Sequence, residues 1–147
     1  MARVSTYLNF VRETEAAFNF YKTVFNSDYT GGGIMRYSDM IPPEDGSKLP
    51  DADKNLIVHI ELPILDGHIL MGSDAPESMQ FKVSFGNNSY IMLEPDTKEE
   101  TGKLFTLLSE GGIIIEDLQE MFWGGLYGSL TDKFGVKWMF NCSEKPI

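Results

Sequence analysis

The sequence predicts an α+β domain with a largely antiparallel sheet, because a strand–helix–strands pattern occurs twice along its 147 residues. Segments of alternating apolar and polar residues predict the strands, and an apolar stripe at helical spacing predicts one helix in each copy. The length fits a single domain covering 1–147, with module one at about 1–74 and module two at about 80–143.

The first copy opens with an alternating strand at 4–10, and the helix expected at 13–26 carries an aromatic stripe that we assign to the core. Gly31-Gly32-Gly33 lacks the residues of a phosphate loop and is interpreted as a flexible turn. Asp66-Gly67 predicts a tight hairpin, because both positions tolerate positive φ. The other expected elements are strands at 34–37, 55–62 and 68–72, and a Pro-rich acidic loop at 40–54 that is either a lid or a surface excursion.

The second copy opens with alternation at 80–85, which predicts another strand. Thr97 and Glu100 form a capping-box pattern at a helix N-terminus. Gly111-Gly112 ends that helix, because glycine adopts the left-handed C-cap conformation at little cost. The helix is expected to bury Thr101, Leu104, Phe105 and Leu108, and strands are expected at 90–93, 113–115 and 136–142, the last after a turn at 132–135.

Charge and composition exclude some classes of function. The 12 basic and 22 acidic side chains give a net charge of -10, and such a surface repels nucleic acid and anionic lipid. No apolar run is long enough to span a membrane, and no export signal is visible. The single cysteine, Cys142, cannot form an internal disulfide and is expected to be a small buried apolar residue. We therefore expect a cytoplasmic protein that binds neither nucleic acid nor membrane.

The most specific strings lie in the closing stretch: Phe122-Trp123-Gly124, Tyr127-Gly128, Thr131-Asp132, Phe134-Gly135-Val136 and Trp138-Met139. Earlier strings are Tyr7-Leu8-Asn9-Phe10, His59-Ile60-Glu61-Leu62-Pro63-Ile64 and Leu70-Met71-Gly72-Ser73-Asp74. In this order, the chain resembles the PhnB-like branch of the vicinal-oxygen-chelate (glyoxalase/bleomycin resistance/extradiol dioxygenase) superfamily over nearly its whole length. The resemblance implies two βαβββ modules in a curved, mostly antiparallel sheet, with helices outside and a concave cavity inside. It also implies a homodimer, sometimes with modules exchanged between chains.

The resemblance also implies where metal ligands would lie, on the first and last strands of each module. Those positions fall near Ser5 to Tyr7, Leu70, Val83 or Ser84, and Met139, and none offers the expected His, Gln or Glu. We therefore predict no metal site and no cofactor, with a divalent metal kept as an alternative. The methyltransferase activity often ascribed to PhnB-like proteins lacks support, because no glycine-rich strand–loop–helix for a cofactor is present.

His59 and Glu61 are the candidate catalytic residues. They lie two positions apart on one expected strand, so their side chains emerge on the same face. They form either an acid–base pair, or part of a metal site, or a hydrogen-bonded pair that lines the cavity without a catalytic role. His68, the other histidine, follows the hairpin turn and is expected near the rim, in solvent.

The strand faces opposite the helices would line the cavity. Those faces carry Ser5, Tyr7 and Asn9; Ile57, His59 and Glu61; Lys82 and Ser84; and Lys137, Met139 and Asn141. Together with two aromatic residues near glycines, they supply the ligand-binding candidates: Tyr7, Asn9, His59, Glu61, Lys82, Trp123, Tyr127 and Met139. Trp138 alternates with Val136 and Phe140 and is assigned to the core.

Our first hypothesis is a small-molecule-binding protein that holds an apolar or aromatic ligand in the concave cavity. The alternative is an enzyme of the same superfamily, with or without a metal, that uses the His59–Glu61 pair. A third hypothesis is a partner-binding dimer without a ligand. The residues alone leave open whether the chain is an enzyme.

Overall fold

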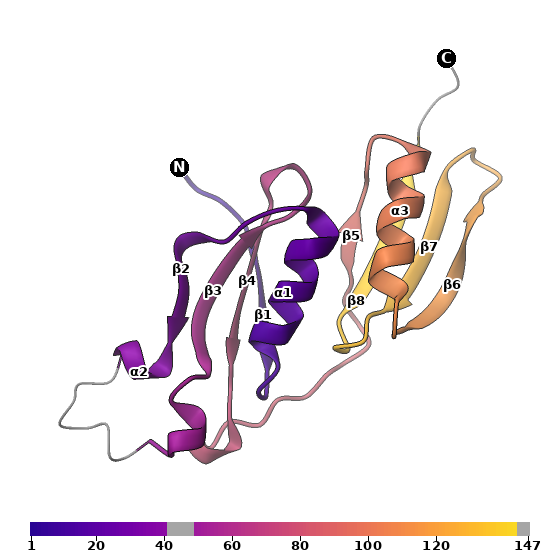
Figure 1. Ribbon diagram of the computed structural model, residues 1–147. Helices are drawn as coiled ribbons and strands as arrows, with labels where there is room; N and C mark the ends of the chain where they lie inside the picture. The colour runs from indigo at the N-terminus through magenta and orange to yellow at the C-terminus, as the bar shows by residue number, and fades with distance from the viewer. Residues whose placement is uncertain (41–48, 144–147) are drawn as a thin grey trace. The chain divides into compact units, whose positions relative to one another are not determined.

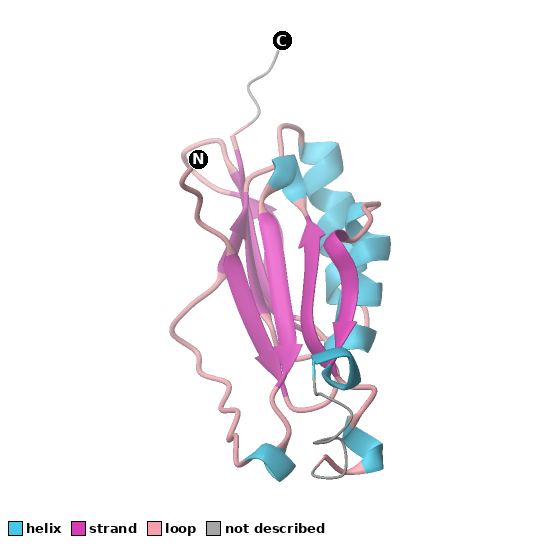
Figure 2. Cartoon of the chain, turned by 90° about the vertical axis from the view of Figure 1, so that its left-hand side faces the viewer, coloured by secondary structure: helices cyan, strands magenta, loops and turns pink. Residues whose placement is uncertain are grey.

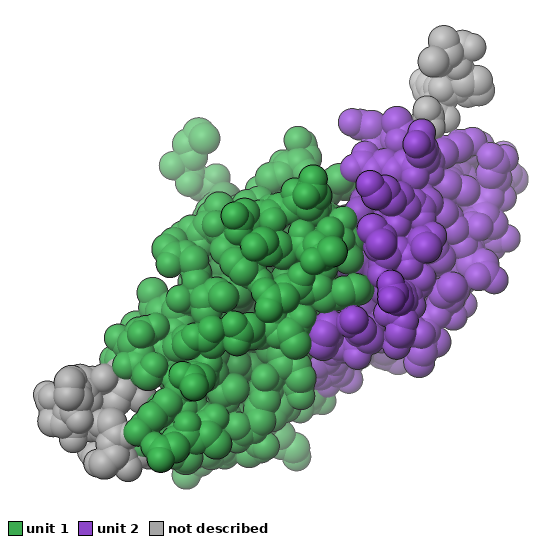
Figure 3. Space-filling view, viewed as in Figure 1, with its two compact units in different colours: residues 1–84 green, residues 85–147 purple. Residues whose placement is uncertain are grey.

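The computed structural model describes residues 1–40 and 49–143, which fall into two compact units, 1–84 and 85–147 (Figure 3). Each unit contains a four-stranded mixed sheet with a 12-residue helix packed on it (Figures 1 and 2). In each sheet the first and last strands of the unit are parallel neighbours, and the other pairs are antiparallel. The predicted α+β class with two βαβββ repeats is confirmed.

The sheet of the first unit has the strand order β1-β4-β3-β2. Its strands are β1 (Thr6–Phe10), β2 (Thr30–Arg36), β3 (Ile57–Pro63) and β4 (Ile69–Asp74), and its helices are α1 (Thr14–Phe25) and the short α2 (Tyr37–Met40). Three single turns of 3-10 helix lie at Asp51–Asp53, Leu65–Gly67 and Glu77–Met79.

Helix α1 forms because its apolar residues recur on one side and because both of its ends are satisfied. Ala17, Phe18 and Tyr21 are fully buried, as the aromatic stripe predicted. At the C-terminus, Asn26 takes the left-handed conformation with φ 49°, which asparagine tolerates. The N-terminus is capped from a distant strand: the Asp74 carboxylate accepts a hydrogen bond from the backbone N–H of Thr14 at 3.0 Å. These contacts hold α1 on one face of the sheet.

The sheet of the second unit has the strand order β5-β8-β7-β6. Its elements are β5 (Ile91–Leu93), α3 (Lys98–Ser109), β6 (Ile113–Glu120), β7 (Leu126–Thr131) and β8 (Lys137–Cys142). The predicted cap is confirmed, because the Thr97 side chain accepts a hydrogen bond from the backbone N–H of Glu100 at 3.1 Å. The four residues predicted for the buried stripe of α3 are all buried: Thr101, Leu104, Phe105 and Leu108.

Turns, glycine positions and core assignments agree with the sequence in several places. Asp66 and Gly67 both have positive φ in the hairpin between β3 and β4. Gly111, which follows the C-cap residue Glu110 of α3, has φ 75°. Trp138 is fully buried and Cys142 is 1% exposed, so both belong to the core as predicted.

The strand predicted at 80–85 does not form. Phe81 and Phe85 are each 51% exposed, and Lys82 and Ser84 are exposed beside them. Alternation describes one segment only, whereas a strand also needs a neighbouring strand to satisfy its backbone groups. Lys82 and Ser84 therefore do not lie on a sheet face in this chain.

Three predictions for the first unit are also wrong in detail. Ile57 was placed on the face opposite the helix but is fully buried, because β3 is irregular there: buried Ile57 and Ile60 are three positions apart. Val4 was expected to open the first strand, at 4–10, but it precedes β1 and is 86% exposed. His68 was expected in solvent, but it is partly buried and its Nε2 lies 2.9 Å from Thr6 Oγ1.

The expected 40–54 loop falls partly outside the described residues. Residues 41–48 lie outside the described residues, and after them Leu49 and Asp53 are buried. Gly31-Gly32-Gly33, interpreted from the sequence as a turn, lies within β2, and the strand begins at Thr30. Within the described ranges, no helix has the length and apolar character needed to cross a membrane.

The Asp53 carboxylate connects three loops of the first unit through its contacts with Arg12 and Ser78. Its carboxylate is 1% exposed and lies 2.6 Å from an Arg12 guanidinium nitrogen, and it accepts a short hydrogen bond from the Ser78 hydroxyl. Glu77 adds a second, longer contact to Arg12 at 3.6 Å. The Ser78 hydroxyl and the Arg12 guanidinium lower the pKa of Asp53.

We expect this arrangement to make part of the stability depend on pH. A carboxyl group whose pKa is lowered by folding adds stability above its unfolded pKa, about 3.9, and loses it as the pH falls through the lower folded pKa. The stability difference between the wild type and Asp53→Asn should therefore be constant from about pH 7 to pH 5 and shrink below about pH 4. Urea unfolding over this range measures it, and a difference that persists at acid pH would contradict the assignment.

Candidate functional site

The candidate site is the face of the first sheet opposite α1. Tyr7 and Asn9 reach this face from β1, and His59 and Glu61 reach it from β3. The strand register aligns Tyr7 with Met71 of β4, and Met71 with Glu61. The structure thus brings together, across the intervening strand β4, side chains that are 52 positions apart in the sequence.

Four of these polar side chains form a continuous chain of contacts, which we call the Arg3–Tyr7 cluster: Arg3, Glu61, His59 and Tyr7. The Tyr7 hydroxyl lies 3.4 Å from His59 Nδ1, and the two rings are 5.8 Å apart at 35°. His59 Nε2 lies 3.5 Å from Glu61 Oε1. An Arg3 guanidinium nitrogen lies 3.4 Å from the same Glu61 oxygen. Each contact is near the upper limit for a hydrogen bond, so a small side-chain movement makes or breaks it.

Exposure within the cluster is graded. The Glu61 side chain is 14% exposed, His59 31% and Arg3 59%. Tyr7 is 48% exposed, the second most exposed member of the cluster after Arg3. Beneath the surface, the Glu61 carboxylate is flanked by one permanent cation and one titratable ring. A neutral His59 that accepts at Nδ1 from the Tyr7 hydroxyl donates from Nε2 toward Glu61.

A second polar pair joins β1 with β4. The Ser73 hydroxyl of β4 donates to the Asn9 side-chain oxygen at 3.0 Å, directly across the β1–β4 register. The Asn9 amide nitrogen is not used in this bond and stays available to another acceptor. Asn9 therefore offers a donor beside the cluster.

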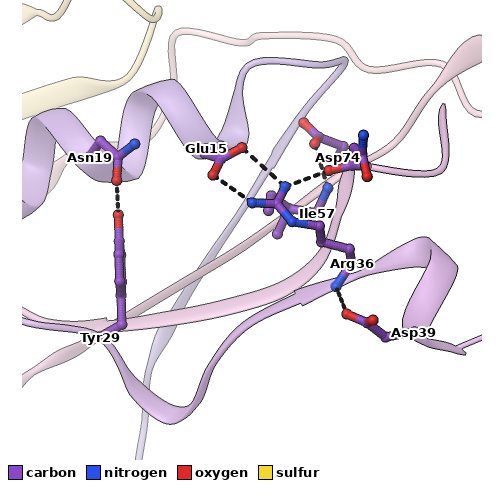
Figure 4. Close-up of polar contacts among 8 residues, drawn as sticks. Glu15, Asn19, Tyr29, Arg36, Asp39, Ile57 and Asp74 are labelled. Atoms are coloured by element: carbon purple, nitrogen blue, oxygen red, sulfur yellow. Dashed lines mark hydrogen bonds and ion pairs between the residues drawn. The ribbon is translucent and has the colours of Figure 1, made fainter. Parts of the chain in front are cut away.

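On the helix side, a set of charged residues fixes strand β2 (Figure 4). The Arg36 guanidinium contacts both oxygens of Glu15 on α1, at 3.1 and 2.7 Å, and also donates to the Asn55 carbonyl. The Arg36 backbone N–H donates to Asp39, and the donation from Arg36 to Glu15 lowers the pKa of Glu15. Burial raises the pKa of Tyr29, whose hydroxyl donates to Asn19. These contacts anchor β2, the strand that pairs with Glu61.

The other predicted ligand-binding residues lie elsewhere. Lys82 is in the exposed segment that forms no strand. In the second unit, the Tyr127 hydroxyl of β7 lies 3.3 Å from Glu116, and burial raises the pKa of Tyr127. Met139 of β8 pairs with Met92 and Ser129. Trp123 lies in the turn after β6, 52% exposed and packed edge-on against Phe122.

Three residues of the site were not singled out from the sequence. Arg3 and Tyr7 are separated by an even number of positions, so extending the alternation of the first strand toward the N-terminus would have placed Arg3 on the same face as Tyr7. Ser73 was noted only as part of a string. Gly31 was interpreted as a flexible turn, although it lies beside Glu61. Within 1–40 and 49–143, no three His, Cys, Asp or Glu side chains are grouped closely enough to hold a metal ion.

Comparison with known proteins places the chain in a family. The sequence profile of the 3-demethylubiquinone-9 3-methyltransferase family matches residues 2–140. Protein YjdN of Escherichia coli (strain K12) is 29% identical over 144 residues, covering 94% of this chain and 93% of its own.

Solved structures agree with this placement. The crystal structure of PA1353 from Pseudomonas aeruginosa is 28% identical, with a TM-score of 0.81 over 99% of this chain and 100% of its own. A PhnB protein from Bacillus cereus is 25% identical, with a TM-score of 0.74 over 96% and 99%. Glyoxalase/bleomycin resistance/dioxygenase proteins share the fold at identities of 17% and 10%. The chain therefore belongs to the PhnB-like 3-demethylubiquinone-9 3-methyltransferase family and shares its fold with glyoxalase/bleomycin resistance/dioxygenase proteins.

Proposed function

We propose that this protein binds a small apolar or aromatic molecule on the open face of the first sheet, in the concave cavity that its fold implies. One observation carries the proposal: Tyr7, His59 and Glu61 meet on a face that α1 leaves uncovered. A site with a few oriented polar groups beside apolar surface is typical of small-molecule binding.

The same face offers the apolar part of such a site. Tyr7 is 48% exposed, Met35 of β2 is 37% exposed, and Met71 lies between Tyr7 and Glu61 in the register. Flat aromatic surface and flexible thioether side chains suit an aromatic ligand. Tyr7, Asn9 and His59 would orient its polar groups. A homodimer is also part of the proposal, and light scattering would measure its mass.

The family's name describes a methyltransferase, and the residues do not fit a nucleoside-containing methyl donor. Such a donor is usually held by a glycine-rich strand–loop–helix. The β1–α1 connection is Val11-Arg12-Glu13, without glycine, and the negatively charged Asp74 already occupies the N-terminus of α1. The β5–α3 connection is Glu94-Pro95-Asp96-Thr97, also without glycine. We therefore propose no methyl-transfer step.

A second candidate function is acid–base catalysis by the His59–Glu61 pair. The observation that favours it is the chain of contacts from Arg3 through Glu61 and His59 to Tyr7. A carboxylate on one ring nitrogen orients the imidazole and stabilises its protonated form, while the other nitrogen can take a proton from a hydroxyl group. A ligand that is chemically changed during incubation would favour this function, whereas one recovered intact would favour binding alone.

A thermal-shift screen with planar aromatic compounds tests the binding proposal. A compound that binds only the folded state raises the melting temperature. For such a compound, His59→Ala and Glu61→Ala should each weaken binding about tenfold, which corresponds to one lost hydrogen bond of about 1.4 kcal/mol. His68→Ala is the matched control, because His68 contacts Thr6 and not the cluster. Equal affinities in all three variants and the wild type would exclude the cluster from binding.

A further inference from the structure

Strand β2 has an unusual shape beside Glu61. Gly31, Gly32 and Gly33 all have positive φ, at 64°, 94° and 78°. Thr30 pairs with Glu61, and the next registered pair joins Met35 with His59. Residues 31–34 therefore bulge out opposite a single residue of β3. The bulge lies directly beside the two strand positions that carry the histidine and the carboxylate.

The three glycines differ in what a side chain would meet. A Cβ atom at Gly31 would lie 2.6 Å from Glu61 Cδ and 3.2 Å from Glu61 Cγ, and it would overlap Glu61 Oε2. A Cβ atom at Gly32 or Gly33 would meet nothing within 4 Å. Positive φ is thus shared by the whole run, whereas the need for empty space is particular to Gly31.

We propose that Gly31 is a positioning residue for Glu61: the missing side chain is the space in which the Glu61 carboxylate lies while it contacts His59 and Arg3. This inference rests on the proposed function, since it concerns the same site. It gives Gly31 a role that positive φ alone does not, because Gly32 and Gly33 also have positive φ and a Cβ atom there would meet nothing.

The two oxygens of the Glu61 carboxylate have different neighbours, and this determines what a side chain at position 31 would do to the Arg3–Tyr7 cluster. Glu61 Oε2 faces Gly31, and Glu61 Oε1 is the atom within reach of both His59 and Arg3. The two oxygens belong to one rigid carboxylate, so pushing Oε2 aside also moves Oε1. A Cβ at Gly31 should therefore separate Glu61 from His59 and Arg3 together, and the Tyr7–His59 contact loses the group that orients the ring.

The test needs no ligand. The side-chain ¹H–¹³C cross-peaks of His59 and His68 are recorded at one fixed pH, with Glu61→Gln as the reference for a lost carboxylate. His68→Asn assigns the two peaks, because the chain has only two histidines. In Gly31→Ala, the His59 peak should move by at least half of the displacement seen in Glu61→Gln. In the control Gly32→Ala, which also places alanine at positive φ but causes no collision, it should stay within a tenth of that displacement.

Each outcome decides the proposal. A His59 peak that is unmoved in Gly31→Ala, or moved equally in Gly31→Ala and Gly32→Ala, overturns it and leaves Gly31 with a backbone role only. Should Gly31→Ala fail to fold, Gly31→Ala combined with Glu61→Ala removes the collision and should fold; continued failure to fold also overturns it. A failure of the proposed function can be told apart from a failure of this inference. Equal ligand affinities in the wild type and in the His59 and Glu61 variants would reject the function, and they would not alter the cross-peak result.

Discussion

Replacing Asp74 with alanine is expected to lower the free energy of unfolding by about 3 kcal/mol or more. The variant leaves two buried N–H donors without their acceptor, and each unpaired donor costs about 1–3 kcal/mol. Asp74 is 1% exposed at the end of β4. One carboxylate oxygen accepts from the backbone N–H of Thr14 and the other from that of Ile57, at 3.0 and 2.8 Å. Both donor residues are themselves fully buried, so water cannot replace the carboxylate.

The measurement is equilibrium urea unfolding followed by circular dichroism. Asp51→Ala is the matched control, because the Asp51 side chain is 93% exposed and its loss should change stability by about 0.5 kcal/mol or less. Asp74→Asn should fall between the two, since it keeps one acceptor oxygen. Amide hydrogen exchange adds a local readout: the Thr14 and Ile57 amides should exchange faster in Asp74→Ala. Equal stability of the Asp74→Ala and Asp51→Ala proteins would refute this role.

Local sequence patterns predicted the elements whose stability is local. The Thr97 cap, the buried stripe of α3 and the positive φ of Asp66 and Gly67 depend on residues a few positions apart. Such signals are complete within one segment, so one sequence is enough to identify them. The fold class followed from the order of these elements together with the resemblance to PhnB-like proteins.

Predictions failed where a segment depends on a distant partner. The 80–85 segment alternates as a strand does, but the described chain supplies no strand beside it. The burial of Ile57 depends on Asp74, 17 positions away, and on an irregular pairing with β2. Asp74 also caps α1 from 60 positions away, a contact that no helix-capping pattern reveals.

The candidate site likewise combines features that local sequence patterns predict with features that depend on distant residues. Alternation places Tyr7 and Asn9 on one face of β1, and the same rule places His59 and Glu61 together on β3. The strand order then lets the Tyr7 side chain reach His59 across β4, which no local pattern specifies. The space at Gly31 was beyond local prediction as well, because it depends on how far β2 bulges opposite Glu61.

In the second unit, Asp132→Ala is expected to cost about 3 kcal/mol or more for the same reason, because three donors depend on one carboxylate. Asp132 is 3% exposed. One oxygen accepts from the backbone N–H groups of Phe134 and Val136, at 2.8 and 3.1 Å, and so closes the turn before β8. The other accepts from the indole N–H of Trp138 at 2.8 Å, in the centre of the core. The loss therefore affects the turn and the core at once.

The variant Trp138→Phe separates these two contributions. It removes one donor and leaves both backbone donors paired with Asp132, so it should cost less than Asp132→Ala, about 1–2 kcal/mol.

Urea unfolding gives both values, and tryptophan emission gives a local readout. In a Trp123→Phe background, Trp138 is the only indole, and its emission should shift to longer wavelength in Asp132→Ala as water reaches the ring. If Trp138→Phe proved as costly as Asp132→Ala, indole packing would dominate and the carboxylate would matter little to the turn. The expected order follows from the geometry, because Asp132→Ala removes the acceptor of two backbone N–H groups and of the indole, whereas Trp138→Phe removes one donor together with its need for an acceptor.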